Sequence, residues 1–415
     1  MTAIDHFLSN DNGKGSFSAD IEPVLRIKPG TGETIGFETD DEVYDQLYEG
    51  KTLDQITAQI NPVTGPVFVE GAEPGDTLAV HIHDIELTEF GYSVYLPGAG
   101  ALAGRMGEDQ MARRIPVKDG KVTLLDGVEV DALPMIGCIG TAPAAGEGSV
   151  VMPSFANGGN MDLTDAKPGS TVYLPVDVPG ALLSIGDIHA IMSRGESSFV
   201  AIEAQGTAIV SVDLIKGVKH RAPRIETEDE WIFIGLGNPV QESIQRGYED
   251  VFDFLVEDNG YSREDAYVVM SALAHSELGG PTGSALRAIS PLRIRNPEEC
   301  CMSFAYTARQ ITVGTAVLAA LTITGFTSPA AAAPDQTEQI TASGTSAAES
   351  EASVPKLYGN SPDTESVRAV YDRSGSSLPQ TTTELAVAAA VAGGLLTTAT
   401  ATVVAGRRER EAAEA

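Results

Sequence analysis

Short runs of alternating apolar and polar residues, separated by turn residues, dominate the first two thirds of the chain. The clearest run covers residues 78–85, where apolar side chains occupy every second position. Because successive side chains of a strand point to opposite faces, this period predicts strands rather than helices. Further strands are predicted over residues 17–35, 67–70, 115–130, 134–140, 171–178, 199–204 and 207–214. Their regular spacing is typical of a sandwich or a barrel.

A different period begins near residue 239. Apolar residues recur at three- and four-residue steps, which predicts an amphipathic helix over residues 239–257. A capping-box pattern predicts a second helix over residues 262–276, and a strand follows over residues 288–294. A short polar stretch at residues 40–54 is also compatible with a helix. We therefore predict a mainly β domain over residues 1–300 with a carboxy-terminal helical hairpin.

The composition changes abruptly after this domain. We predict an apolar, transmembrane or signal-like segment over residues 301–333, a disordered linker over residues 334–384, and an apolar segment with an Arg-rich end over residues 385–415. One reading gives the tail one or two apolar helices that insert into a membrane. Another makes the whole tail disordered, and a third starts a separate fused protein at Met302. Residues 378–382 (Leu-Pro-Gln-Thr-Thr) also resemble a sortase sorting motif.

The charge is strongly negative and concentrated in the predicted domain. The net charge is −31, and residues 302–415 hold 7 Lys and Arg against 11 Asp and Glu, so −27 lies in residues 1–301. Such a field repels phosphate backbones and makes nucleic acid a poor partner. It favours cations and tolerates neutral small molecules, although acidity also serves solubility.

Cysteine usage and the amino terminus bear on location. The three cysteines, Cys138, Cys300 and Cys301, are too few for a disulfide framework, and the first residues lack the pattern of a signal peptide. We therefore expect a cytoplasmic catalytic domain, which the tail anchors to a membrane if its apolar runs insert. The positive-inside rule would then keep the Arg-rich end in the cytoplasm.

Candidate metal ligands and bases gather in two segments. Asn160 and Asp162 follow a glycine pair, and Asp187 and His189 lie two residues apart, hence on one face of an extended segment. Glu196 lies seven residues beyond His189. Carboxylates with one imidazole suit Zn²⁺ or another divalent cation. From residue types alone, an Asx turn at Asp162 and a structural role for His189 stay open.

A second histidine pair lies on the clearest predicted strand. His81 and His83 are two residues apart and share a face. Paired histidines at this spacing can bind a metal, but the solvated outer face of an antiparallel sheet is the commoner explanation.

Several ordered segments resemble the acetamidase/formamidase family over about residues 15–297. They are residues 61–78, 137–143 (Gly-Cys-Ile-Gly-Thr-Ala-Pro), 158–162 (Gly-Gly-Asn-Met-Asp) and 186–190 (Gly-Asp-Ile-His-Ala). The resemblance implies hydrolysis of small linear amides such as formamide or acetamide, releasing ammonia. It also implies an acetamidase/formamidase-like β/α fold. A homo-oligomer is a separate expectation, because strand-rich domains of this kind often pair through their edges.

The resemblance also implies roles for the candidate residues. Asp162, Asp187 and His189 would bind a divalent ion, with Zn²⁺ and Ca²⁺ as the candidates. Glu196 would act as base and proton shuttle with His189 beside it, and Asn160 would hold the substrate amide or the oxyanion. The amide is thus the expected small-molecule partner.

The sequence departs from the family pattern at two places near these residues. Met192 and Arg194 stand where the pattern has Gln and Asp, and residues 274–277 (Ala-His-Ser-Glu) lack an expected aspartate. An arginine close to a cation site would weaken metal binding unless another acid compensates. The alternative function is therefore a catalytically degenerate, surface-anchored binding or structural protein.

Overall fold

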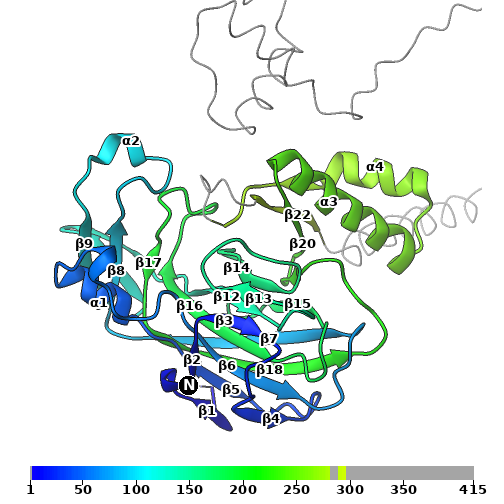
Figure 1. The fold of residues 1–415 in the computed structure, drawn as a ribbon. Coiled ribbons are helices and arrows are strands. Elements are labelled where there is room, and N and C mark those ends of the chain that lie inside the picture. The colour runs from blue at the N-terminus through cyan, green and yellow to red at the C-terminus, as the bar shows by residue number, and fades with distance from the viewer. Residues whose placement is uncertain (1, 281–287, 296–415) are drawn as a thin grey trace, which may run out of the picture. The chain divides into compact units, whose positions relative to one another are not determined.

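A computed structural model of the protein describes residues 2–280 and 288–295 (Figure 1). Residues Met1–Pro297 form one compact unit. The predictions for residues 301–333, 334–384 and 385–415, including the sorting motif and the apolar runs, lie outside the described residues. Within the described ranges, no helix is long and apolar enough to cross a membrane.

One large sheet runs through the unit and is mostly antiparallel. Among the described residues it has nine strands, in the spatial order β1 (His6–Leu8), β5 (Ile35–Glu38), β18 (Gly206–Ile215), β7 (Thr77–Leu87), β15 (Thr171–Pro175), β19 (Arg224–Glu226), β20 (Glu230–Gly237), β22 (Ala288–Arg295) and β21 (His275–Ser276). The longest pairing joins β18 to β7, where ten residues of β18 have partners.

A second sheet holds the segments in which candidate site residues were predicted. Over the described part of the chain its main path is β11 (Val128–Asp131), β10 (Lys121–Leu125), β9 (Met111–Lys118), β8 (Phe90–Tyr95), β17 (Ile202–Glu203), β16 (Leu183–Ile191), β12 (Met135–Gly140) and β14 (Gly158–Asn160). The strands β6 (Val63–Val69), β2 (Gly13–Lys14) and β4 (Leu25–Ile27) extend it beside β16. A small separate pair joins β13 (Glu147–Ser149) to β3 (Ser16–Ser18).

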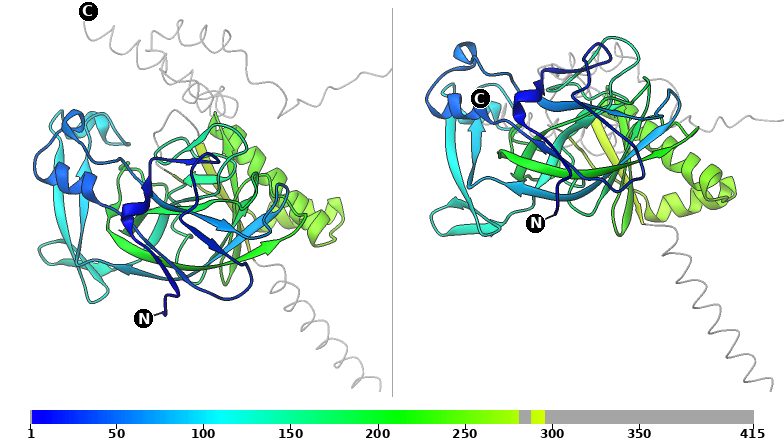
Figure 2. Two further views of the ribbon diagram at one scale, coloured as in Figure 1. Left: turned by 60° about the horizontal axis from the view of Figure 1, so that its bottom comes forward. Right: turned by 90° about the horizontal axis from the view of Figure 1, so that it is seen from below.

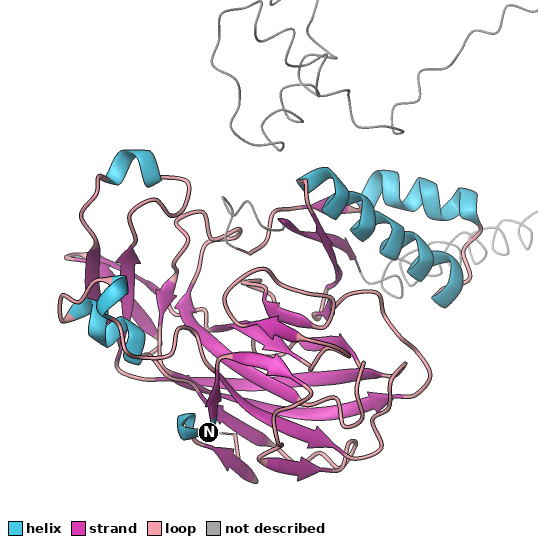
Figure 3. Cartoon of the chain, viewed as in Figure 1, coloured by secondary structure: helices cyan, strands magenta, loops and turns pink. Residues whose placement is uncertain are grey.

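The main core lies between the two sheets. It combines apolar side chains from β7 and β18 with those of β12, β16 and β6, and Val80, Val210, Ile136, Ile185 and Val67 are among its buried members. Figure 3 shows the strand layers at the centre and the helices at their margins. This burial on both sides explains why β16 is a nearly continuous apolar run around its two charged positions.

The predicted helical hairpin is present. It consists of α3 (Val240–Asp253), which continues as a π-helical turn over Phe254–Asp258, and α4 (Arg263–Leu273). Ser262 caps α4, since its hydroxyl accepts a hydrogen bond from the Asp265 backbone. The hairpin packs on β20 and β22 through a second core that includes Phe233, Leu255 and Leu292. Figure 2 shows the hairpin and the β8–β9 region at opposite ends of the unit.

The predicted mainly β class is confirmed, with some elements missed. Two short helices, α1 (Glu42–Tyr48) and α2 (Ala103–Met106), lie near β8 and β9, and 3₁₀ turns cover Asn10–Asn12 and Leu53–Gln55. The short helix predicted at 40–54 corresponds to α1 and the second of these turns. The strands β8, β16 and β20 were not predicted, although β16 carries Asp187 and His189.

Candidate active site

Strand register brings the predicted residues of distant segments together. In the second sheet β14, β12, β16 and β17 lie side by side, and Asn160 pairs with Cys138 of β12. On the next strand, His189 pairs with Met135 of β12 on one side and with Glu203 of β17 on the other. These pairings bring Asn160 of β14, His189 of β16 and Glu203 of β17 to neighbouring strands around β12.

His189 lies at the centre of a buried carboxylate cluster. Its Nε2 atom is 3.3 Å from Glu203 Oε2, 3.4 Å from Asp187 Oδ1 and 3.7 Å from Asp162 Oδ1. The side chains of all four residues are at most 5% exposed. Burial of three carboxylates around one imidazole is costly unless charge is compensated, so the cluster is unusual for a purely structural feature.

Glu196 completes the cluster from the loop between β16 and β17. Its carboxylate groups with Asp162 and His189, and one ligand atom from each of these residues lies within 4.8 Å of the others. A second group of the same kind consists of Asp187, His189 and Glu203. The structure thus gathers Asp162, Asp187, His189 and Glu196, which were predicted from sequence, and adds Glu203, which was not.

The sequence contains one signal for Glu203. Apart from that residue, positions 200–204 are apolar, so the acid interrupts an apolar run that includes a short strand. A charged residue at such a position requires a partner, which here is His189.

Four residues in and beside the cluster have left-handed backbone conformations. The φ angles are 52° at Asn61, 46° at Asp162, 57° at Asp187 and 41° at Glu196. For residues other than glycine this conformation is unfavourable, and it persists only when surrounding structure holds it. Its concentration at one cluster indicates that the backbone is shaped to direct these side chains inward.

Gly137 leaves the space that two of the carboxylates occupy. A Cβ atom added at this residue of β12 would lie 2.3 Å from Asp187 Oδ2 and 2.6 Å from Asp162 Oδ1. Both distances are far below normal contact, so only glycine lets the carboxylates approach the strand from this side. The carbonyl oxygen of Gly137 also accepts hydrogen bonds from the backbones of Met161 and Asp162.

Two side-chain amides orient the carboxylate of Asp162. Asn160 donates from Nδ2 to Asp162 Oδ2 at 2.9 Å, and its Oδ1 accepts from Asn61 Nδ2 at 3.3 Å. Asn61 also donates to the Val150 carbonyl at 2.9 Å. Asn160 therefore lies beside the cluster with its amide bonded to Asp162, and its predicted contact with the substrate amide or the oxyanion stays a prediction.

The cluster shifts the pKa values of its members in opposite directions. Burial, helped by the Asp187 charge, raises the pKa of Asp162 well above its usual value, and burial with Asp162 raises that of Glu196. Burial also raises the pKa of Glu203. Burial opposes ionisation of Asp187 and His189 as well, but their mutual attraction prevails. The attraction between Asp187 and His189 lowers the pKa of Asp187. Together with the Glu203 charge, the same attraction raises the pKa of His189 well above its usual value.

The residues present fit a divalent cation. Within the described part of the chain, Asp162 Oδ1, His189 Nδ1 and Glu196 Oε2 are buried without a hydrogen-bond partner. Four carboxylates exceed the one positive charge that His189 can supply, and a cation would balance the excess. Carboxylate oxygens with a single imidazole match Zn²⁺, whereas Ca²⁺ would use the oxygens alone.

Comparison with known proteins agrees with the motifs around this cluster. The model of the acetamidase/formamidase family matches residues 6–146 and 144–280. The chain belongs to this family. The acetamidase of Mycolicibacterium smegmatis is 27% identical over 279 residues, which are 49% of this chain and 66% of that protein. The formamidase of Methylophilus methylotrophus is 27% identical over 302 residues, 56% of this chain and 73% of its own length.

A solved structure shares the fold. It is that of a recombinant predicted acetamidase/formamidase from the thermophile Thermoanaerobacter tengcongensis, with a TM-score of 0.66 and 30% identity. The likeness covers 71% of this chain and 96% of that one. The chain spans 60% of the length of a third relative, a putative formamidase of Schizosaccharomyces pombe that is 29% identical over 253 residues, so it covers between 60% and 73% of the three curated relatives.

Arg194 and Met192, which depart from the family pattern, have their partners outside the cluster. Arg194 Nη1 lies 2.9 Å from Glu277 Oε2 and 3.4 Å from Asp165 Oδ2, so other acids compensate its charge. Met192 packs in a small apolar cluster with Met135 and Ala201. Neither contact places a positive charge among the candidate ligands, which removes the main sequence argument for a degenerate site.

The histidine pair on β7 has ordinary partners on the sheet. His81 hydrogen-bonds Thr171 and Asp213, each at 2.9 Å, and His83 hydrogen-bonds Ser211 at 2.7 Å. Both side chains reach polar residues of the adjacent strands, as the solvated-face interpretation expects.

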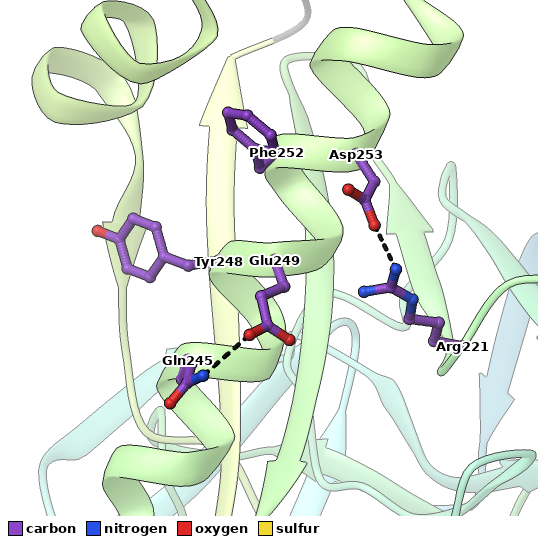
Figure 4. Close-up of a pocket in the computed structure, with 6 residues that line it drawn as sticks. All are labelled: Arg221, Gln245, Tyr248, Glu249, Phe252 and Asp253. Carbon is purple, nitrogen blue, oxygen red and sulfur yellow. Dashed lines mark hydrogen bonds and ion pairs between the residues drawn. The ribbon is translucent and has the colours of Figure 1, made fainter. Parts of the chain in front are cut away.

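Two surface hollows in the described part of the chain lie along α3 and are not lined by residues of the carboxylate cluster. Their volumes are about 420 and 410 Å³, and Arg221 and Glu249 border both. Figure 4 shows the first, in which Arg221 pairs with Asp253 and Gln245 donates to Glu249. These polar groups are engaged with one another, whereas at His189 the atoms Asp162 Oδ1 and Glu196 Oε2 are buried without a hydrogen-bond partner.

Proposed function

We propose that this chain hydrolyses small linear amides to a carboxylic acid and ammonia. The convergence of Asp162, Asp187, Glu196 and Glu203 on His189 is the observation that supports this function most directly. The names of the family relatives, acetamidase and formamidase, support a short carboxamide as substrate.

Glu196 is the proposed proton shuttle. Water attacks the amide carbonyl carbon and transfers a proton to the Glu196 carboxylate. Glu196 then returns the proton to the departing nitrogen, the carbon–nitrogen bond breaks, and ammonia leaves. Burial and the neighbouring Asp162 raise the pKa of Glu196, which suits a group that must both accept and donate a proton near neutral pH.

The remaining residues hold the centre in place. Asp162, Asp187 and His189 are the proposed ligands of a divalent cation, which would polarise the amide carbonyl and make water a stronger acid. Glu203 and Asp187 fix the His189 ring through Nε2, and Asn160 orients Asp162. In this proposal the role of Asn160 is to position the Asp162 carboxylate through this hydrogen bond.

The test measures ammonia release from formamide and acetamide by the full-length chain. Activity should fall on chelation and return with Zn²⁺ or, if the oxygens alone bind, with Ca²⁺. Glu196→Gln should lower kcat by about 10²- to 10⁴-fold, as expected for loss of a general acid–base. Glu249→Gln, which alters an exposed acid on α3, is the matched control. Absence of turnover of every short amide, with metal restored, would exclude the proposal.

A further inference from the structure

A network of charged residues surrounds Asp165, outside the carboxylate cluster. Arg293 Nη1 donates to Asp165 Oδ1 at 2.9 Å, and Arg293 Nη2 also contacts this carboxylate. Glu277 accepts from Arg293 Nε at 2.8 Å and from Arg194 Nη1 at 2.9 Å. Arg194 also reaches Asp165 at 3.4 Å, so two arginines share two acids.

The network joins segments that are far apart in sequence. Asp165 lies in the loop after β14, three residues beyond Asp162, whereas Arg194 lies in the loop after β16, two residues before Glu196. Glu277 and Arg293 belong to the segment after the helical hairpin and to β22, and the Glu277 backbone bonds the Pro291 carbonyl at 3.0 Å. Arg293, which holds Asp165 and Glu277, therefore lies on a strand of the first sheet.

We infer that Arg194, Asp165, Glu277 and Arg293 form a clamp that positions Asp162 and Glu196 for the proposed reaction, on which this inference rests. Asp187, His189 and Glu203 lie on strands, where ladder hydrogen bonds fix their direction. Asp162 and Glu196 lie on loops with left-handed backbones, and the hydrogen bond from the Glu196 backbone goes only three residues back, to Ser193. Side-chain anchors supply the constraint that these loops need.

Exposure separates the two arginines of the clamp. Arg293 and Asp165 are 6% and 4% exposed in their side chains, whereas the side chain of Arg194 is 50% exposed. Removal of Arg194 should therefore leave the fold intact while loosening the loop that carries Glu196. Arg194 is a positioning residue, since it acts through Glu196 and Asp162.

The experiment compares amide hydrogen exchange in the wild-type chain and in Arg194→Ala, Glu277→Gln and Arg194→Lys. Exchange at the amides of Glu196 and Phe199 should be faster in the first two variants, and Arg194→Lys, which keeps the charge, should restore much of the protection. The matched control is Arg221→Ala, because Arg221 forms a similar exposed ion pair with Asp253 on α3. Unchanged melting temperatures show that the variants fold.

Two further measurements connect the clamp to function. Arg194→Ala should lower the Zn²⁺ affinity, measured by titration calorimetry, or kcat by about 10- to 100-fold. KM should change much less. The double variant with Glu277→Gln should lose less than the sum of the two single variants, because both disrupt the same Arg194–Glu277 ion pair.

The outcomes distinguish the clamp from the proposed function. If exchange at Glu196 and Phe199 in Arg194→Ala equals that of the wild type, or rises equally in Arg221→Ala, the clamp is refuted. If the wild-type chain neither binds Zn²⁺ nor releases ammonia, the proposed function fails, while the exchange data still decide whether the clamp holds the loop.

Discussion

Gly137→Ala adds one methyl group at the narrowest point of the carboxylate cluster. The φ angle of Gly137 lies outside the left-handed range, so alanine meets no backbone obstacle there. The whole effect of this substitution falls on Asp187 and Asp162, whose oxygens lie 2.3 and 2.6 Å from the new Cβ position.

The size of the displacement follows from these distances. Ordinary van der Waals contact begins near 3.4 Å, so Asp187 Oδ2 must move by about 1.1 Å and Asp162 Oδ1 by about 0.8 Å. Asn160 and the His189 ring hold both groups, which leaves little freedom for relaxation. A misplacement of about 1 Å lowers catalytic rates by about 10²-fold, or about 2.7 kcal/mol in activation free energy. The overpacking itself should destabilise the fold by about 1–3 kcal/mol.

Ammonia release and Zn²⁺ affinity of the folded Gly137→Ala variant provide the assay, with urea unfolding to measure stability. Gly104→Ala is the control, because an added Cβ at Gly104 meets nothing within 4 Å. Wild-type kcat and Zn²⁺ affinity in the Gly137 variant would show that the carboxylates do not work in the positions described.

Three further predictions concern other parts of the molecule. Glu203→Gln should lower kcat or Zn²⁺ affinity by about 10- to 100-fold in the same assays, because Glu203 lies 3.3 Å from His189 Nε2; wild-type values would contradict its place in the site. Arg293→Met should cost about 3–5 kcal/mol in urea unfolding by leaving Asp165 buried without its main partner, whereas Lys219→Ala, at an exposed pair with Asp177, should cost at most about 1 kcal/mol. Burial lowers the pKa of His220 from 6.5 to about 4, so His220 favours the fold while neutral. The free energy that neutral His220 contributes is present above pH 6.5 and is lost as the pH falls toward 4. The free energy of unfolding of His220→Gln should therefore fall by about 2–3 kcal/mol less than that of the wild type over this range. Equal losses in the two proteins would refute the assignment.

The fold was predictable where the local period was strong. The strand near residues 78–85 and the helix near 239–257 each show one apolar face, and both are present as β7 and α3. The strands β16 and β20 were missed because they are buried almost throughout and lack alternation. The equally buried β12 was predicted only as a short apolar run between turn residues.

The candidate site was predictable only in part, for a related reason. Asp162, Asp187 and His189 stand in segments that resemble a known family and Glu196 follows shortly after the last of them, but Glu203 lies in no such segment. Its role depends on the pairing of β17 with β16, and strand partners are a property of the whole fold. The left-handed backbone at Asp187 was equally invisible, because nothing in the local sequence marks a positive φ angle at this residue.

Arg194 shows how the effect of a charge depends on its distant partners. Judged by its neighbours in sequence, an arginine two residues before Glu196 opposes a cation site. In the structure its guanidinium reaches Glu277, 83 positions away, and Asp165, 29 positions away. An arginine between two acids of a network relieves their repulsion and withdraws its own charge from the cluster. The same residue that counted against activity therefore becomes part of the support for Glu196.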